Sequence, residues 1–323
     1  MVRKFGKPRI VVSRCIEFDS CRYNGLKISS DVVKKLKTYV DFTPICPEVE
    51  IGLGVPREPI RIITGKDALR LVQPATGRDV TDEMLRLTEG FLGSVGDVDG
   101  FILKSRSPSC GIKDVKVYRD MEKGAAVARD VGFFAGAVLK MFPHLPVEDE
   151  GRLTNFKLRE HFLTRLYTLA GFRRIKPSRR MGEMVRFHTE NKLLFMAYNQ
   201  KELKILGRIV ANLEKLPVDR VFERYESHLH NVFLRPSRYT SNVNVMMHAL
   251  GYFSKGLSHR EKSYFLDSLE RYRSGKIPLS ACLSVIRAWI ERFEEEYLMK
   301  QTYFEPFPEG LVEISDSGKG RKL

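Results

Sequence analysis

Three of the chain's five cysteines follow short apolar runs of the kind that form buried strands. They are Cys15 after "RIVVS", Cys46 after "FTPI", and Cys110 a short loop beyond "GFILK". Ligands of open parallel sheets gather beyond the carboxyl ends of the strands. If these three strands are neighbours, we expect their thiols to meet at one edge of the sheet.

Three convergent thiolates are ligands for a soft metal, which means zinc or an iron–sulfur cluster. Structural zinc favours four protein ligands, often in closely spaced CxxC pairs, and the sequence contains no such pair. A set of three leaves one coordination position open, which is what a catalytic metal needs. The spacing alone leaves three interpretations: a cluster, a zinc ion, or unconnected cysteines that fill a core.

The elements that must position these cysteines alternate along residues 1–145. The pattern predicts strands at 9–13, 42–45, 60–64, 69–73 and 100–104. The strands at 60–64 and 69–73 are expected to form a pair. It predicts helices at 30–40, at 81–95 and at about 124–142. Alternating strands and helices indicate an α/β unit with a mainly parallel, Rossmann-like sheet that is covered on both faces.

The pattern changes after "FPHLPVEDEG", where two prolines and an acidic run favour a linker at 146–155. Helical periodicity dominates beyond it, which predicts an all-α unit over 156–312. The polar residues 313–323 are expected to form a flexible tail. The expected fold class is therefore an α/β unit followed by an all-α unit.

The positive charge is concentrated in the second half of the chain. Of the net charge of +15, residues 151–323 contribute +12, with 31 Lys and Arg against 19 Asp and Glu. The segment 152–180 carries nine basic residues and the single acid Glu160. Such a field attracts polyanions and suggests nucleic acid, although a solvated basic face without a partner has the same composition.

No membrane partner is expected, because the longest apolar stretch, "VGFFAGAVL", is too short to span a bilayer. The N-terminus lacks the apolar region and cleavage site of a signal peptide. An odd number of cysteines does not suggest a disulfide framework. We therefore expect a cytoplasmic protein whose cysteines are thiols. The patterns indicate no particular oligomeric state.

Four blocks in the first half are similar to one known family. "SRCIEFDSCRYNG", "CPEVEIGLGVPREP", "LVQPATGRDVTDEM" and "DGFILKSRSPSCGIKD" cover about residues 8–145 and resemble the iron–sulfur thiouracil desulfidase family. The second half, with "HTENKLLFMAYN", "NVMMHALGYF" and "YRSGKIPL", is similar to the helical domain of its longer members. Those two-domain members are implicated in removing sulfur from 4-thiouridine in tRNA.

The resemblance implies a cofactor and a reaction. Cys15, Cys46 and Cys110 would hold a [4Fe–4S] cluster whose fourth iron has no protein ligand. The expected reaction is a hydrolysis without net redox change, in which oxygen from water replaces the thiocarbonyl sulfur. Its products would be uridine in the tRNA and hydrogen sulfide.

The resemblance also implies roles for residues beside the three ligands. Glu48 is expected to activate water, Cys21 to donate or relay a proton, and Ser107 or Ser109 to bind the base or the cluster. Without the resemblance, the simpler interpretations are a solvated carboxylate, a small core residue and turn serines. The segment "GLGVPREP" lacks the lysine and the length of a phosphate loop, so no role is assigned to it.

Two other functions are compatible with the sequence. One is a nucleic-acid-binding protein whose cysteines hold a structural zinc or a redox-sensing cluster without turnover. The other is a desulfidase of free thiouracil. The large basic half argues against it, because a small free base does not require such a surface.

The basic residues with the best claim to bind tRNA lie in two short segments of the second half. They are Arg173, Arg174, Lys176, Arg179, Arg180, Arg235 and Arg238. Such a set could follow a phosphate backbone, while Phe172 or Tyr239 could stack on an exposed base.

Overall fold

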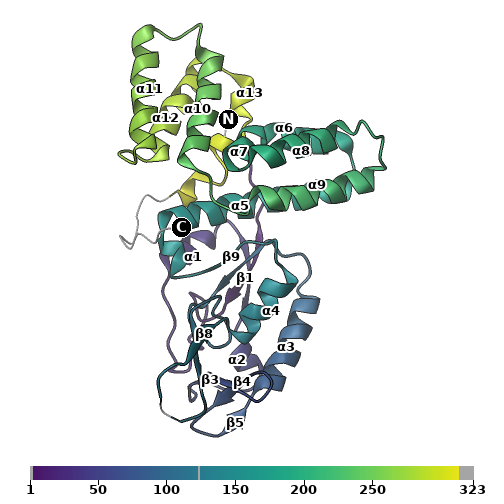
Figure 1. Cartoon of the computed structure of the whole chain (residues 1–323), viewed down its shortest axis with the longest axis vertical. Coiled ribbons are helices and arrows are strands. Elements are labelled where there is room, and N and C mark those ends of the chain that lie inside the picture. Colours follow the sequence, from purple (N-terminus) through teal and green to yellow (C-terminus); the bar gives the residue numbers. More distant parts are fainter. Residues whose placement is uncertain (1–2, 123, 313–323) are drawn as a thin grey trace. The chain divides into compact units, whose positions relative to one another are not determined.

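The computed structural model describes residues 3–122 and 124–312. These residues form two compact units, both visible in Figure 1. The α/β unit comprises Gly6–Leu166 and the described residues after Glu309, and the helical unit comprises Tyr167–Glu309 and the described residues before Gly6. The predicted flexible tail at 313–323 lies outside the described residues.

A four-stranded parallel sheet forms the centre of the α/β unit. Its strands are, in spatial order, β2 (Asp41–Ile45), β1 (Arg9–Ser13), β6 (Gly100–Leu103) and β9 (Val147–Asp149). The runs "IVV" of β1 and "FIL" of β6 are at most 1% exposed, as in a sheet that is covered on both faces. The prediction of an α/β unit with a parallel sheet is confirmed.

Three helices of this unit were expected from the periodicity, and one of them begins later than predicted. The helix α1 (Asp31–Leu36) is capped by Ser30, and α3 (Thr81–Ser94) packs with α4 (Phe133–Met141) on the sheet core. The third prediction placed a helix at 124–142, whereas Ala128–Asp130 forms the strand β8. The strand "ARD" is short and exposed and is defined by its antiparallel pairing with β7 (Val115–Tyr118), so periodicity alone misplaced this boundary.

A second sheet of five strands completes the α/β unit. Its order is β5 (Arg78–Asp79), β4 (Leu69–Gln73), β3 (Arg61–Thr64), β7 (Val115–Tyr118) and β8. The strands β3 and β4 form an antiparallel pair, as predicted. The pairing of β3 with β7 links segments more than 50 residues apart and was not foreseen.

The segment 146–155, predicted as a linker, carries β9 and the short 3-10 helix η1 (Arg152–Thr154). Its acidic side chains form ion pairs, Glu148 with Arg152 at 2.6 Å and Glu150 with Lys104 at 2.6 Å. The helix α5 (Phe156–Ile175) follows, and the division between the two units falls within it.

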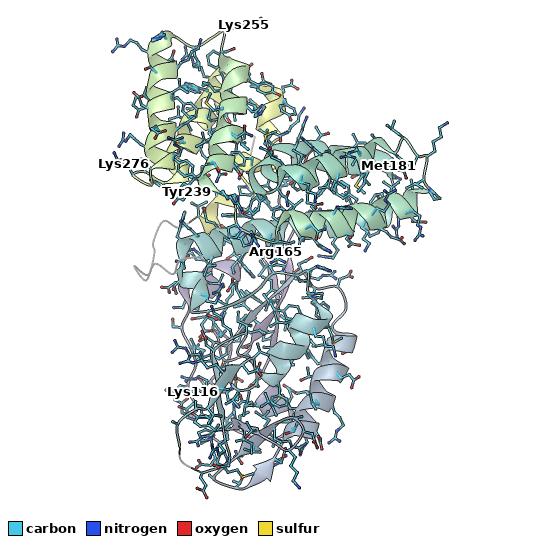
Figure 2. The ribbon with its side chains drawn as sticks, in the orientation of Figure 1. Lys116, Arg165, Met181, Tyr239, Lys255 and Lys276 are labelled. Carbon is cyan, nitrogen blue, oxygen red and sulfur yellow. The ribbon has the colours of Figure 1, made fainter. Side chains whose placement is uncertain are left out.

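The helical unit confirms the prediction that the second half is all-α. After η2 (Lys176–Ser178) its helices are α6 (Met181–Glu190), α7 (Lys192–Tyr198), α8 (Gln200–Ala211), α9 (Val218–Val232), α10 (Tyr239–Phe253), α11 (His259–Arg273), α12 (Leu279–Phe293) and α13 (Glu296–Met299). The loops on either side of α11 carry Lys255 and Lys276 (Figure 2). No helix in the described part of the chain has both the length and the apolar character to cross a membrane.

Candidate active site

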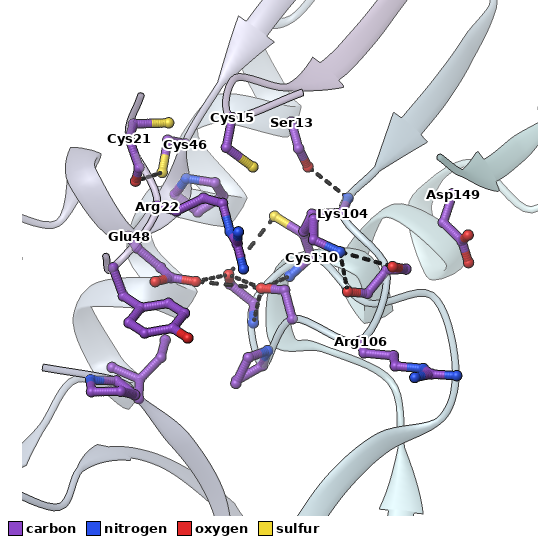
Figure 3. A pocket seen from close by; sticks show the side chains of 18 of the residues that line it. Ser13, Cys15, Cys21, Arg22, Cys46, Glu48, Lys104, Arg106, Cys110 and Asp149 are labelled. Carbon is purple, nitrogen blue, oxygen red and sulfur yellow. Dashed lines mark hydrogen bonds between the residues drawn. The ribbon is translucent and has the colours of Figure 1, made fainter. Parts of the chain in front are cut away.

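A cavity of about 810 Å³ lies in the α/β unit, beyond the carboxyl ends of the parallel strands. Four of the five cysteines line it, and none of the four is more than 8% exposed. They are Cys15, Cys21, Cys46 and Cys110, which Figure 3 shows around one space. The fifth, Cys282, is buried in the helical unit.

The order of the strands brings these cysteines together. Because β2, β1 and β6 are parallel neighbours, their chains all leave the sheet at the same edge. Cys46 directly follows β2, and Cys15 comes two residues after β1. The loop to Cys110 turns at Arg106, whose φ of +57° lies in the left-handed region. The expected convergence of the three thiols on one cavity is thus observed.

The glycine at position 132 lets the loop of Cys110 pack against the start of α4. A Cβ on Gly132 would stand 2.5 Å from the carbonyl oxygen of Ser109, closer than real contacts allow. The Gly132 N–H also donates to the carbonyl of Gly111 at 2.7 Å. The loop "SPSCG" is therefore fixed by backbone contacts with this helix.

The buried thiols share hydrogen bonds. The hydrogen bond with the Cys15 thiol raises the pKa of Cys21 to about 11, and burial adds to the shift. The hydrogen bond with Cys21, together with burial, raises the pKa of Cys46. Burial raises the pKa of Cys110 to about 12. Metal binding replaces such protons, because the thiolate is the ligand.

Glu48 and the two predicted serines form one hydrogen-bonded group. Glu48 lies in the short helix α2 (Pro47–Glu50), and its Oε1 accepts from Ser109 Oγ at 2.6 Å and from Ser107 Oγ at 3.3 Å. Ser107 Oγ in turn accepts from the N–H groups of Ser109 and Cys110, each at 3.2 Å. The structure therefore places these three predicted side chains beside a predicted cysteine ligand.

Arg57 belongs to this group, and the sequence analysis missed it. Its Nε and Nη2 donate to Glu48 Oε2 at 3.0 and 2.7 Å, and its side chain is only 4% exposed. Its Nη1 donates to the carbonyl oxygen of Cys21 at 2.9 Å. Arg57 stands in "GLGVPREP", which contributes to the family resemblance but was assigned no role of its own. Glu48 lies nine residues before Arg57, a spacing that matches no helical repeat, so the sequence did not indicate that the two side chains form a pair.

Further basic side chains line the same cavity. Lys104 is paired with Glu150, and its backbone N–H donates to Ser13 Oγ at 2.9 Å. Three other cations of the lining have no ion pair within the described residues: Arg22, Arg106 and Lys113. The guanidinium of Arg22 lies 5.7 Å from the ring centre of Tyr23, which is 43% exposed. These side chains suit a ligand that combines a ring with negative charge.

The donor set fits an iron–sulfur cluster in its chemistry, because Cys thiolates are the ligands of such clusters. Within the described residues, no three His, Cys, Asp or Glu side chains are arranged to hold one metal ion. In a cluster each ligand binds a different iron, so the ligands surround a larger body. Several buried thiols around one cavity match that requirement in chemistry and in space.

The predicted tRNA-binding residues lie in the helical unit, and two of them already have acidic partners. Lys176 pairs with Glu226 at 2.7 Å, and Arg179 pairs with Asp219 at 3.0 Å. Four of the set have no ion pair among the described residues: Arg174, Arg180, Arg235 and Arg238. Arg173 lies in the last turn of α5.

The two aromatic residues predicted to stack on a base have different environments. Phe172 is 2% exposed and packs among Phe187, Phe222 and Tyr225, so the prediction that it stacks on a base is wrong. Its position on the helix faces the core. The basic residues next to it in the sequence had suggested an exposed face instead. Tyr239 is 38% exposed, with its ring 5.0 Å from that of Tyr272.

Two family models match the chain, one in each half. Residues 10–150 match "2-thiouracil desulfurase", and residues 192–308 match "Protein of unknown function (DUF1722)". The uncharacterized protein YbbK of Bacillus subtilis (strain 168) is 37% identical over 109 residues, which cover 32% of this chain and 72% of that protein. The uncharacterized protein YbgA of Escherichia coli (strain K12) is 28% identical over 163 residues, covering 50% and 86%.

One similar solved structure is described as the [4Fe-4S]-dependent thiouracil desulfidase TudS. It is 29% identical to this chain, the match covers 46% of this chain and 93% of that one, and the TM-score is 0.37.

Proposed function

Since residues 10–150 make the chain a member of the 2-thiouracil desulfurase family, we propose that it is a desulfidase acting on 4-thiouridine in tRNA. Oxygen from water replaces the thiocarbonyl sulfur, which gives uridine and hydrogen sulfide. The observation that carries the proposal is the cavity in which four buried cysteines meet the group formed by Glu48, Ser109 and Arg57.

The cofactor in this proposal is a [4Fe–4S] cluster held by Cys15, Cys46 and Cys110, with one iron left open. Such a cluster supplies a thiophilic Lewis acid that polarises a C=S bond. Cys21 is assigned no iron, because a fourth protein ligand would close the open position. The shared cavity and the mutual hydrogen bonds place all four thiols close enough to take part, and the division among them is the part of the proposal that single substitutions test.

The protein's own side chains position water and move protons. Glu48 Oε1, which also accepts the Ser109 hydroxyl, takes a proton from the attacking water. Arg57 fixes the second oxygen of the same carboxylate, so that Oε1 keeps its direction. Cys21 donates a proton to the departing sulfur. One water supplies the oxygen and both protons of hydrogen sulfide, so no oxidant or reductant is consumed.

The charges of both units favour tRNA over free thiouracil as the substrate. Free thiouracil has no phosphate that could contact the cavity cations Arg22, Arg106 and Lys113. A nucleotide in RNA brings phosphates for these cations to bind. The basic half of the chain, with its net charge of +12, offers further contacts for a large polyanion. We place this activity in the reducing cytoplasm, where cysteines stay reduced and can bind a cluster; none of the five forms a disulfide in the structure.

The test is anaerobic reconstitution with iron and sulfide, followed by incubation with tRNA that contains 4-thiouridine. Mass analysis of the nucleosides should show 4-thiouridine replaced by uridine, with an equal amount of sulfide released. A reconstituted protein that binds this tRNA and releases no sulfide would instead be the non-catalytic nucleic-acid binder. Turnover of thiouracil without turnover of tRNA would reassign the substrate to the free base.

A further inference from the structure

The outer face of α8 carries three exposed cations and no acid. Lys201, Lys204 and Arg208 lie within an arc of about 60° and span about 10 Å of the helix axis, given about 100° and 1.5 Å per residue. The helix contains one acid, Glu202, which is 9% exposed and lies 2.7 Å from Nδ1 of His228. We call Lys201, Lys204 and Arg208 the α8 stripe.

Packing determines which face of α8 meets the solvent. Glu202, Leu206 and Ile209 are at most 9% exposed and face the unit's core, where α8 contacts α6, α7 and α9 (Figure 1). The stripe occupies the opposite side of the helix, and all three of its residues are exposed. Core packing therefore leaves the stripe free to meet a partner.

Three exposed cations of the same unit are neutralised within the chain. Arg186 pairs with Glu183 at 2.6 Å, Arg220 with Glu223 at 3.0 Å, and Arg224 with Glu214 at 2.9 Å. In the part of the chain that the structure describes, by contrast, the stripe residues form no ion pair, and neither do Arg174, Arg180, Arg235 and Arg238. Like charges three and four positions apart on a helix repel each other. A partner that supplies regularly spaced negative charges would turn this repulsion into attraction.

We propose that the α8 stripe is a phosphate-binding surface for the backbone of RNA. Successive cations are separated by about 4.5 and 6 Å along the axis, which suits a partner with a closely spaced row of phosphates. A helix that lies in a membrane surface carries its apolar residues beside the basic ones and inserts them. In α8, Leu206 and Ile209 instead pack into the core, and the other apolar side chains between 203 and 210 are half-buried. That the RNA is a tRNA rests on the proposed function. That the stripe binds a phosphate backbone rests on the exposed cations alone.

The stripe also changes the surface expected from the sequence. Lys176 and Arg179 were predicted to contact tRNA, yet both are already paired with acids. The sequence did not indicate a binding role for the stripe residues, because basic residues and an acid on one helix are typical of an ordinary solvated face. Only the burial of Glu202 shows that the outer side of the helix has no counter-charge.

The test compares two triple variants of the full-length protein that carry the same net charge. In the stripe variant, Lys201→Gln, Lys204→Gln and Arg208→Gln remove three unpaired cations. In the control, Arg186→Gln, Arg220→Gln and Arg224→Gln remove three paired ones. Binding to an unmodified tRNA transcript is measured over a series of salt concentrations. The stripe variant should bind about 10- to 100-fold more weakly at low salt, with a salt slope smaller by about 2–3, and the control should stay close to the native protein.

Three results would overturn the proposal. The first is a stripe variant that binds tRNA as tightly as the native protein. The second is a control variant that weakens binding equally, so that net charge alone explains the effect. The third is a native protein that binds phosphatidylserine vesicles through the stripe more tightly than it binds tRNA. Sulfide release from the free 4-thiouridine nucleoside separates this inference from the proposed function. The stripe variant should release sulfide at the native rate. If no variant releases sulfide while tRNA binding still depends on the stripe, the desulfidase activity fails and the RNA surface stands.

Discussion

At the scale of single residues, one guanidinium joins two parts of the cavity wall. Arg57 contacts the carboxylate of Glu48 through two nitrogens and the carbonyl of Cys21 through the third. A planar fork holds a carboxylate in one orientation, which the point charge of lysine does not. We therefore assign Arg57 the positioning of Glu48.

The variant Arg57→Lys should keep the cluster and lose turnover. We expect kcat for sulfide release to fall about 10- to 100-fold, as when a reacting group is displaced by about 1 Å, with iron content unchanged. Arg78→Lys is the matched control, because Arg78 pairs with Glu83 on the surface of the same unit. Full activity of Arg57→Lys, or loss of its iron, would contradict the positioning role.

A second prediction at this scale concerns pH and the helical unit. Burial lowers the pKa of His188 to about 4, with Lys192 adding to the shift, and its Nδ1 lies 3.1 Å from the Tyr225 hydroxyl. In the unfolded chain this pKa is near 6.5. Below that pH the imidazole is protonated in the unfolded chain but stays neutral in the folded unit. The free energy of unfolding therefore falls as the pH decreases from about 6.5 to about 4.

Between pH 7.5 and pH 5, His188 should thus cost about 2 kcal/mol of unfolding free energy. The fluorescence of Trp289, the single tryptophan, reports on unfolding of this unit in urea. His188→Gln, which cannot take up the proton, should lose about that much of the pH dependence. An unchanged pH dependence in this variant would show that His188 does not cause it.

At the scale of elements, the start of α4 holds the loop that carries Cys110. A Cβ at Gly132 would collide with the Ser109 carbonyl at 2.5 Å and with the Gly111 nitrogen at 2.9 Å. Gly132→Ala should therefore destabilise the protein by about 1–3 kcal/mol, as overpacking does, and lower the iron bound on reconstitution. Thermal unfolding and iron analysis measure the two effects.

Gly90→Ala is the matched control, because a Cβ at Gly90 in α3 meets no atom within 4 Å. It should stabilise its helix by about 0.5–1 kcal/mol and leave iron binding unchanged. If Gly132→Ala bound iron as fully as Gly90→Ala, the contact of α4 with the loop would have no part in forming the site.

The elements also show what a sequence can predict. The cysteines after β1, β2 and β6 could be placed at one sheet edge, because parallel strands leave a sheet on the same side. The strand β8 was taken for part of a helix, since its partner β7 is set by tertiary pairing. The role of Arg57 could not be predicted for the same reason: its contacts with Glu48 and with the Cys21 carbonyl, 36 residues away, are made only by the fold.

At the scale of the whole molecule, the distribution of charge separates binding from chemistry. The cavity lies in the α/β unit, and most of the net positive charge belongs to the second half of the chain. A tRNA that uses the basic helical unit should depend on salt, whereas a single nucleoside should not. Raising salt from about 50 to 200 mM should increase the KM for tRNA at least about tenfold and leave the KM for 4-thiouridine nearly constant. If the KM values for both substrates depended equally on salt, the helical unit would have no part in binding the substrate.

The central claim is that three particular thiols hold the cluster and a fourth does not. The measurement is iron and visible absorption after anaerobic reconstitution of five single variants: Cys15→Ala, Cys21→Ala, Cys46→Ala, Cys110→Ala and, as the control outside the cavity, Cys282→Ala. We predict that variants at 15, 46 and 110 lose colour and iron, while Cys21→Ala keeps both and loses turnover, and Cys282→Ala keeps all three. If Cys21→Ala is as colourless as the other cavity variants, or if any of the three proposed ligands can be removed without loss of iron, the account is contradicted.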